Sequence, residues 1–271
     1  MSNDVDVIMP VYNAAHYLKE SIESILDQTY TDFSFIIVDD GSTDGSWKIL
    51  QQYAKRDTRI KLIRNKTNKG IPRTRNTAIA AGKGKYILNL DPDDRCTNDR
   101  VATQVAYMQQ HPSVGICWSH LRWIDQNGNS LSEKHYPQDD KSIRKLFFVY
   151  SAVAQCTSII RREIYDKVWW YDNKFTVTED LDLFLRMGRY SKFANIDRIL
   201  TEYRTYDNNS SHKKHRLMIR LAIKARINAI LYYKYRPNAL WILAIIASIC
   251  IIPFPAYFVH AVFSKFRSLM Y

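Results

Sequence analysis

Short apolar runs alternate with stretches of helical length over the first 90 residues, and this alternation constrains the fold more than any other feature of the chain. Such alternation predicts βαβ units, in which parallel strands form a sheet and helices cover its faces. We expect strands at residues 5–9, 33–38, 60–63 and 86–90, and helices at residues 16–28, 45–56 and 71–81. Pro10 is expected to end the first strand, because proline has no N–H group to donate.

Acidic residues follow two of these strands directly: Asp39 and Asp40 after the second, and Asp91 and Asp93 after the fourth. The carboxyl ends of parallel strands form the edge at which open α/β sheets bind ligands. Carboxylates in one crevice repel one another unless a cation or a proton relieves the repulsion. The pattern indicates a metal-assisted site for a phosphate-bearing substrate. Because no Gly-x-Gly-x-x-Gly follows the first strand, a dinucleotide-dependent dehydrogenase is disfavoured.

Four motifs occur in the order and spacing of family 2 glycosyltransferases, and Glu179-Asp180 follows them as a fifth. They are Pro10-Val11-Tyr12-Asn13, the stretch from Val38 to Asp44, the stretch from Asn68 to Asn76, and Asp91-Pro92-Asp93-Asp94. The chain therefore resembles this family over residues 4–205. The resemblance implies a GT-A fold, which is a Rossmann-like nucleotide-binding α/β domain with a mostly parallel central sheet. It also implies inverting transfer of a sugar from a nucleotide-sugar donor, with a UDP-sugar favoured.

The resemblance places the base of the nucleotide at Pro10, Val11 and Tyr12. Tyr12 offers an aromatic face on which a base can stack. The alternative is a plain strand-to-helix turn with Tyr12 in the core.

The resemblance assigns nucleoside recognition to Asp39 and Asp40, although an Asp-Gly turn is compatible with the same residues. It assigns contact with the nucleotide to Arg75, at the start of a helix that suits an anionic ligand. Arg73 is the alternative, or a member of a solvated basic face.

Asp91 and Asp93 match the metal motif of the family. A hard divalent cation takes oxygen ligands, and it neutralises the charge on a leaving diphosphate. Asp93 is the expected direct ligand, Asp91 is a ligand or a ribose contact, and Asp94 caps the following segment. Magnesium and manganese both fit this ligand set.

Inverting transfer needs one base to take the proton of the attacking hydroxyl. By resemblance that base is Asp180, with Glu179 as the second candidate. Acids at a helix N-terminus that favour the helix dipole are the simpler reading of the same pair.

The chain departs from the family pattern at two places. Tyr206 stands where many relatives carry a histidine that contacts the metal or the diphosphate, and His212 is a possible substitute. Trp169 and Trp170 stand where relatives often show glycine. The two tryptophans form either an acceptor platform or part of the core.

The charge of the chain is concentrated at its C-terminal end. The net charge is +12, the last acidic residue is Asp207, and ten basic residues follow it. Basicity this localised describes a tail rather than a nucleic-acid-binding domain, so nucleic acid is not an expected partner. Lys213, Arg216, Arg220 and Lys224 fall on one side of an expected helix, as in helices that bind anionic membrane surfaces.

Residues 237–264 contain no Asp, Glu, Lys or Arg, and residues 240–263 are long enough to span about 30 Å of hydrocarbon. Pro253 and Pro255 interrupt them, so a kinked span, a re-entrant hairpin and an interfacial segment all fit, as does a buried C-terminal helix. We therefore expect a glycosyltransferase domain at residues 1–207 and a helical membrane-associating region at residues 208–271. The basic residues before the apolar segment place the domain on the cytoplasmic face of the inner membrane.

A membrane-bound enzyme that uses a soluble donor is expected to meet a lipid-linked acceptor, here a saccharide on a polyprenyl diphosphate in surface polysaccharide synthesis. Two alternatives share the same motifs. One is a polyprenyl-phosphate glycosyltransferase, whose phosphate nucleophile needs no strong base. The other is a membrane scaffold that binds nucleotide without turnover.

Overall fold

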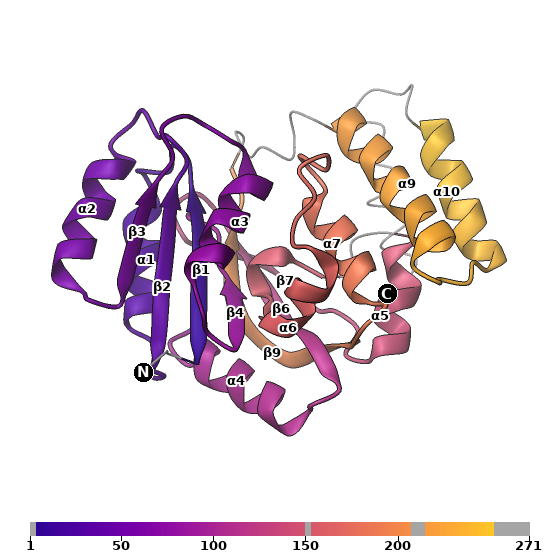
Figure 1. Ribbon diagram of the computed structural model, residues 1–271, viewed down its shortest axis with the longest axis horizontal. Helices are drawn as coiled ribbons and strands as arrows, with labels where there is room; N and C mark the ends of the chain where they lie inside the picture. Colours follow the sequence, from indigo (N-terminus) through magenta and orange to yellow (C-terminus); the bar gives the residue numbers. More distant parts are fainter. Residues whose placement is uncertain (1–3, 150–152, 207–214, 252–271) are drawn as a thin grey trace.

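The computed structural model describes residues 4–149, 153–206 and 215–251, and these form one twisted sheet with helices packed on both faces (Figure 1). The strand order is β3-β2-β1-β4-β8-β6-β9-β5, with β7 paired to β6. The strands are β1 (Val5–Val11), β2 (Phe33–Asp39), β3 (Ile60–Arg64), β4 (Tyr86–Asn89), β5 (Arg95–Cys96), β6 (Val114–Ile124), β7 (Ser130–Lys134), β8 (Ile159–Arg161) and β9 (Lys192–Arg204). The helices are α1 (Leu18–Leu26), α2 (Ser46–Arg56), α3 (Ile71–Ala81), α4 (Arg100–Gln110), α5 (Asp140–Phe147), α6 (Arg162–Val168), α7 (Glu179–Met187), α9 (His215–Tyr232) and α10 (Ala239–Ile251), with a 3-10 turn, η1, at Gln155–Thr157.

The first four strands are all parallel, as the alternating pattern predicted. β1 pairs with β2 and β4, and β2 pairs with β3. The third helix, α3, has the predicted bounds, because Gly70 and Pro72 fix its start and Gly82 follows its end. The carboxyl ends of β1, β2 and β4 therefore meet at one edge of the sheet.

The expectation of a mostly parallel sheet is wrong for the second half of the chain. β8 is antiparallel to both β4 and β6, β5 is antiparallel to β9, and only β6 and β9 run parallel there. Strands that follow one another through hairpins and short connections do not need the helical crossover that parallel neighbours require. Hairpin β6–β7 is an example, with its turn at Asn127-Gly128 and Gly128 at φ +86°.

The first strand continues through Pro10 to Val11, so the expectation that Pro10 ends it is wrong. Pro10 stays in register with Val38 of β2, and the carbonyl of Val11 accepts the N–H of Asp40 at 2.7 Å. Pairing of β1 with β4 ends at Ile8. The missing N–H of Pro10 falls on that unpaired side, where no ladder hydrogen bond is lost.

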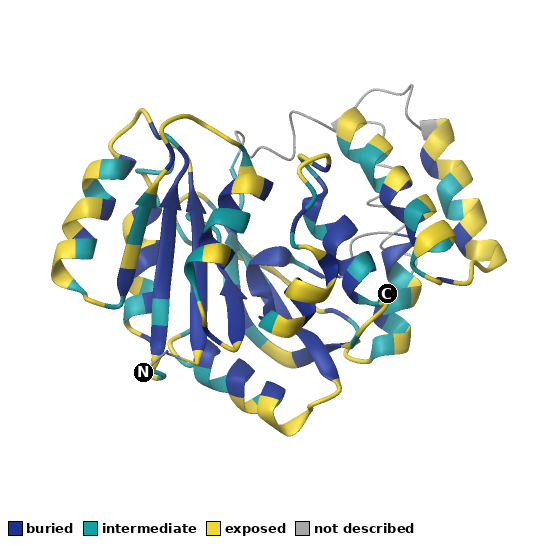
Figure 2. Ribbon diagram, viewed as in Figure 1, coloured by how far each residue is buried: buried dark blue, intermediate teal, exposed yellow. Residues whose placement is uncertain are grey.

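Two hydrophobic clusters lie on the two faces of the sheet, and the strands contribute alternate residues to them. Ile36 and Val38 of β2 pack in one cluster, with α3 and α7, while Phe35 and Ile37 pack in the other, with α1 and α4. A strand buried on both faces reads as a continuous apolar run. Figure 2 shows these strands as the buried centre of the molecule.

The two C-terminal helices pack against the first of these clusters. Ala225 and Ala229 of α9 are fully buried in it, and Trp241 of α10 stacks on Phe148 with ring centroids 3.9 Å apart. Arg226 is also buried, where its Nε donates to the carbonyl of Phe147 at 2.9 Å, and burial lowers its pKa to about 10.

The outer side of α10 is apolar and exposed (Figure 2). Leu243, Ile246 and Ile249 are each exposed by half or more of their surface. Among the described residues, no helix is both long and apolar enough to cross a bilayer. Residues 252–264 of the predicted apolar segment lie outside the described part of the chain.

Candidate active site

Four of the five motifs meet at the carboxyl edge of the parallel strands. Asp39 ends β2 and Asp40 follows it, Asp91 follows β4, and Arg75 reaches Asp91 from the second turn of α3. The fifth motif joins them from the other side, because Glu179 at the start of α7 contacts the same arginine. The structure therefore brings together residues that are up to 140 positions apart in the chain.

Asp39 is fully buried, and one of its oxygens lacks a hydrogen bond. Its Oδ1 accepts the N–H of Ser42 at 3.3 Å. Its Oδ2 lies 3.0 Å from Nε of Arg64, close enough for an ion pair, but it accepts no hydrogen bond within the described residues. A buried acceptor without a donor costs free energy unless a ligand supplies one. A ring N–H of a base is such a donor.

Asp40 has a different environment, because three donors already occupy its carboxylate. Oδ1 accepts from Nδ2 of Asn65 at 2.7 Å and from the N–H of Lys69 at 2.9 Å, and Oδ2 accepts from the N–H of Gly70 at 2.8 Å. These contacts hold the loop that leads into α3. The structure thus gives Asp40 a positioning contact, and nucleoside recognition by Asp40 stays a prediction.

Tyr12 is 48% exposed, so its alternative placement in the core is wrong. It lines a small cavity of about 40 Å³ together with Pro10, Val11 and Asp40, and Ile71 and Thr74 of α3 close the other side. An exposed ring beside Asp39 and Asp40 is suitably placed for stacking on a base.

Arg75 is the central cation of the site and is only 4% exposed. Its Nη1 donates to Oε1 of Glu179 at 2.7 Å, and its Nη2 donates to Oδ1 of Asp91 at 2.8 Å. Burial alone lowers the pKa of this guanidinium, but Asp91 and the α7 carboxylates outweigh burial and the net pKa is raised. Arg73, the alternative, is exposed on α3.

Asp91 and Asp93 are half-buried and offer oxygens to a cation. Oδ1 of Asp91 is held by Arg75, and Oδ2 of Asp93 accepts the hydroxyl of Tyr206 at 2.8 Å. Burial, and then the charge of Asp91, raises the pKa of Asp93 to about 6. A divalent cation relieves repulsion of this kind, so the carboxylates present fit Mg²⁺ or Mn²⁺.

A second grouping places Asp91 with Asp94 and Cys156, whose ligand atoms lie within 4.8 Å of one another. It fits a hard cation less well. Burial raises the pKa of both Asp94 and the Cys156 thiol well above their usual values, whereas a metal-bound sulfur must be a thiolate. Oδ1 of Asp94 also accepts the N–H of Arg204 at 2.9 Å. Asp93 therefore remains the predicted ligand beside Asp91.

The two acids of α7 differ in how they are held. Glu179 is buried and paired with Arg75, and burial raises its pKa to about 7 despite that arginine. Asp180 is half-buried and has no cationic partner among the described residues, and its Oδ1 accepts the N–H of Leu181 at 2.8 Å. Burial raises the pKa of Asp180 as well. An unpaired carboxylate of raised pKa is the better proton acceptor of the two.

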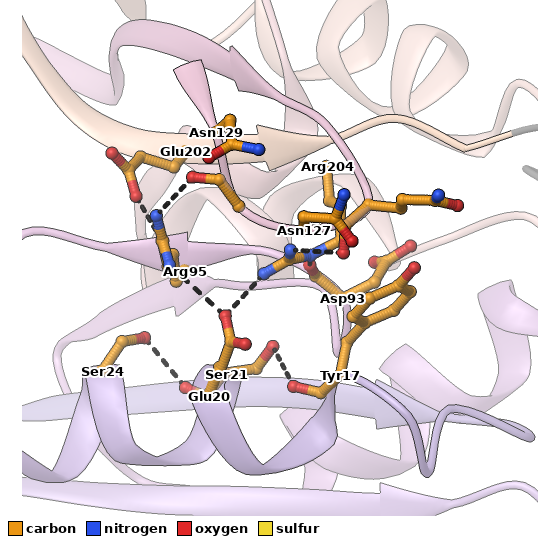
Figure 3. A network of polar contacts seen from close by, with 12 residues as sticks. Tyr17, Glu20, Ser21, Ser24, Asp93, Arg95, Asn127, Asn129, Glu202 and Arg204 are labelled. Carbon is orange, nitrogen blue, oxygen red and sulfur yellow. Dashed lines mark hydrogen bonds and ion pairs between the residues drawn. The ribbon is translucent and has the colours of Figure 1, made fainter.

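Arg204 and Glu20 support the metal motif, and sequence reasoning did not assign them a role. Arg204 is 1% exposed, donates from Nε to the carbonyl of Asp93 at 2.9 Å, and donates from Nη2 to Glu20 at 2.7 Å (Figure 3). Its guanidinium lies 4.5 Å from the ring centroid of Tyr17. Glu20 also pairs with Arg95, as Figure 3 shows. The sequence offered one signal for Arg204, the pair Tyr203-Arg204 shortly before Tyr206.

The two tryptophans after α6 adopt a backbone conformation with positive φ, which usually favours glycine. Trp169 and Trp170 have φ values of 60° and 63°. Trp169 is 90% exposed, so it does not belong to the core, while Trp170 is half-buried and donates from Nε1 to Asp166. The next residue, Tyr171, lies over the guanidinium of Arg75 at 5.6 Å. Trp169 is thus an exposed aromatic residue two positions before Tyr171, which contacts Arg75 of the site. His212, the other departure considered, lies outside the described residues.

A family model described as glycosyl transferase family 2 matches residues 6–169 of this chain. An uncharacterized glycosyltransferase of Methanocaldococcus jannaschii is 37% identical over 204 residues, which cover 74% of this chain and 70% of that protein. The Bacillus subtilis glycosyltransferase TuaG, provisionally assigned to teichuronic acid biosynthesis, is 31% identical over 215 residues, which cover 78% of this chain and 82% of that one.

Solved structures show the same fold. The chain matches S. aureus TarS 1–349 in complex with UDP-GlcNAc with a TM-score of 0.68 at 20% identity, covering 84% of this chain and 67% of that one. It spans 66% of the same fragment in its UDP complex and 40% of a longer TarS structure. It also matches a mannosyltransferase from Pyrobaculum calidifontis in complex with GDP-Man and Mn²⁺, with a TM-score of 0.65 at 14% identity, covering 98% of this chain and 74% of that one. At these identities the likeness concerns the fold alone.

Proposed function

Because this chain belongs to glycosyltransferase family 2 and is a glycosyltransferase, we propose that it is an inverting, divalent-metal-dependent enzyme that moves a sugar from a UDP-sugar to a saccharide hydroxyl. One observation carries the proposal. Arg75 joins Asp91 of the metal motif to Glu179 of the catalytic pair, so the groups proposed for the donor and for the acceptor lie next to one another.

The donor half is built from β1, β2 and α3. Asp39 accepts the ring N–H of the base through Oδ2, which accepts no hydrogen bond from the described residues, and Tyr12 stacks on the base. A uracil ring supplies one such N–H. Two structural neighbours were solved with UDP-GlcNAc and with GDP-Man, and these support a nucleotide-sugar donor without fixing the sugar.

Asp93 and Asp91 would hold the divalent cation. When bound, such a cation neutralises the charge of the leaving diphosphate as the sugar–oxygen bond breaks. Arg204 fixes the backbone of this motif through the carbonyl of Asp93 and the carboxylate of Asp94. A neighbour solved with Mn²⁺ supports a divalent cation but does not separate manganese from magnesium.

Asp180 acts as the base. It takes the proton of the acceptor hydroxyl while the oxygen attacks the anomeric carbon from the face opposite the diphosphate, so the new bond has inverted configuration. Glu179 does not compete for this proton while it is paired with Arg75 at 2.7 Å. Its role is to keep the guanidinium and Asp91 in place.

The acceptor is proposed to be a saccharide on a polyprenyl diphosphate, met at the cytoplasmic face of the inner membrane during polysaccharide synthesis. The exposed apolar side of α10 and the exposed Arg216, Arg220 and Lys224 on α9 support contact with an anionic membrane. TuaG supports a role in polysaccharide synthesis, as does Escherichia coli WcaA, a glycosyl transferase provisionally assigned to colanic acid biosynthesis that is 32% identical over 193 residues.

The testing experiment is turnover of a panel of sugar nucleotides by the membrane-extracted full chain, with and without Mg²⁺ or Mn²⁺. Asp93→Ala and Asp180→Ala are measured alongside. We expect metal-dependent turnover of one donor that both variants lose. Nucleotide binding without turnover, in the presence of acceptor lipid, would instead identify a scaffold. A lipid tail on a soluble acceptor should raise activity, and an unchanged rate would remove the lipid-linked acceptor from the proposal.

A further inference from the structure

A cavity of about 320 Å³ lies at the connection between α9 and α10, and no residue of the candidate active site lines it. Its wall comes from Arg144 of α5, from Gly188 and Arg189 after α7, and from the connection that contains Lys234 and Arg236. In Figure 1, α9 and α10 lie at the end of the molecule opposite α2. The cavity is therefore a separate feature with chemistry of its own.

Cations dominate this cavity, and none of its lining residues is an acid. Arg144 is already engaged, because its Nε donates to Asp140 at 2.8 Å and its Nη2 donates to the carbonyl of Ser191. Arg189, Lys234 and Arg236 are exposed and form no ion pair with any described residue. Three uncompensated cations around one cavity attract an anion, and phosphate is the common biological anion that several cations bind together.

The floor of the cavity is aromatic and fixed in place. Tyr235 and Trp241 are each 8% exposed, and Nε1 of Trp241 donates to the carbonyl of Lys145 at 3.1 Å. Tyr235 fits because Gly188 has no side chain, since an added Cβ would lie 2.0 Å from its hydroxyl oxygen. The arrangement is thus a packed aromatic floor beside exposed cationic side chains. Tyrosine and tryptophan with one apolar side and one polar atom are typical of membrane interfaces.

The apolar face of α10 begins beside these cations. Arg236 lies three positions before the start of α10, and Leu240, Leu243 and Ile246 follow on the exposed surface of that helix. A soluble phosphate would use the cations and leave these side chains in water. A membrane lipid satisfies both features, because its phosphate lies at the level of the cations and its acyl chains cover the apolar face.

We propose that this cavity binds the phosphate headgroup of a membrane lipid and thereby sets how α10 lies on the bilayer. This inference deepens the membrane contact of the proposed function and rests on it. Arg189, Lys234 and Arg236 are the headgroup contacts, and Tyr233 and Tyr235 line the same cavity between them.

The test is vesicle flotation of the full chain. The vesicles are pure phosphatidylcholine, phosphatidylcholine with phosphatidylglycerol, and phosphatidylcholine with a polyprenyl phosphate. The cavity variant carries Arg189→Gln, Lys234→Gln and Arg236→Gln. Its matched control carries Arg216→Gln, Arg220→Gln and Lys224→Gln, which removes the same charge from exposed positions of α9 outside the cavity. Thermal unfolding of both variants establishes that they are folded.

We expect the cavity variant to bind both kinds of vesicle that contain an anionic lipid at least about tenfold more weakly than the unaltered chain, and the α9 control to lose several-fold less. Equal losses in the two variants would overturn the proposal, because they would describe unspecific attraction to a charged surface. A loss of binding confined to one of the two anionic lipids would also support the proposal, and it would identify the headgroup that the cavity prefers.

A second arm separates a lipid headgroup from a free phosphate. Inorganic pyrophosphate, added at the phosphate concentration of the vesicles, should leave the chain bound, because pyrophosphate cannot cover the apolar face of α10. Complete release by pyrophosphate would overturn the lipid assignment. Asp93→Ala is expected to bind vesicles as the unaltered chain does, so failure of the donor chemistry and failure of the headgroup site are distinguished.

Discussion

The hydroxyl of Tyr206 donates a hydrogen bond to Oδ2 of Asp93 at 2.8 Å. Tyr206 is the residue that stands in place of the histidine found in many relatives, and it has kept a contact with the metal motif. Burial, and then the charge of Asp93, raises the pKa of this phenol, so Tyr206 is neutral and donates its proton. A neutral donor stabilises the ionised form of Asp93, which is the form that binds a cation.

Tyr206→Phe should therefore weaken the apparent affinity for Mg²⁺ or Mn²⁺ by about tenfold, since a hydrogen bond to a charged group contributes about 1.5–3 kcal/mol. The measurement is donor turnover at increasing metal concentration. Tyr190→Phe is a suitable control, because Tyr190 is exposed and distant in sequence from the motif. Tighter metal binding in Tyr206→Phe would show that the hydroxyl competes with the cation.

Arg75→Met should lower the free energy of unfolding by about 3–5 kcal/mol, because it leaves two carboxylates of the site without their shared cation. It should also abolish turnover, since Asp91 and Glu179 lose the group that orients them. Arg73→Met on the exposed side of the same helix is the matched control and should change stability by less than about 0.5 kcal/mol. Similar destabilisation by both substitutions would contradict the central role of Arg75.

Glu179 makes the stability of the metal-free protein fall as pH rises. Its pKa is raised from 4.5 to about 7 in the folded chain, so between those values the folded state holds a proton that the unfolded state has lost. The contribution is complete below pH 4.5 and is lost as pH approaches 7. At about 1.36 kcal/mol for each pKa unit, the contribution amounts to about 3 kcal/mol. Urea unfolding from pH 4.5 to pH 7.5 should show a flatter pH dependence for Glu179→Gln than for the unaltered chain, and equal slopes would refute this assignment.

Trp169→Gly should weaken binding of the acceptor without straining the backbone. Glycine adopts a φ of 60° without the penalty of about 1–2 kcal/mol of other residues, but its greater freedom in the unfolded chain offsets about 0.5–1 kcal/mol, so stability should change by less than about 1 kcal/mol. If the exposed indole stacks on an acceptor sugar, KM for the saccharide should rise about tenfold while donor hydrolysis is unchanged. Trp169→Tyr should restore most of the loss. Unchanged KM in Trp169→Gly would exclude an acceptor platform there.

The parts of the fold that local sequence determines were predictable. Strand β2 and helix α3 were located within a residue, because an apolar run and a Gly-Ile-Pro start are local signals. The placement of Asp39 and Asp91 at the same edge of the sheet also followed from the parallel order of the first strands. The pairing of Arg204 with Glu20 did not, because it joins residues 184 positions apart and depends on how β9 returns beside β6. Burial of Arg226 was unpredictable for the same reason, since its helix reads as a basic stripe until its packing partner is known.

Asp180→Asn separates the proposed reaction from that of a polyprenyl-phosphate glycosyltransferase. A saccharide hydroxyl must lose its proton as it attacks, so loss of the base should reduce kcat by about 10²–10⁴. KM for the donor should stay within about threefold, because no donor contact is removed. Glu163 is an exposed acid on α6, so Glu163→Gln controls for the loss of one negative charge and should leave kcat unchanged. A phosphate nucleophile is already ionised and needs no base. Full activity of Asp180→Asn toward a polyprenyl phosphate would therefore assign the chain to that reaction and leave Asp180 as a helix N-terminal acid.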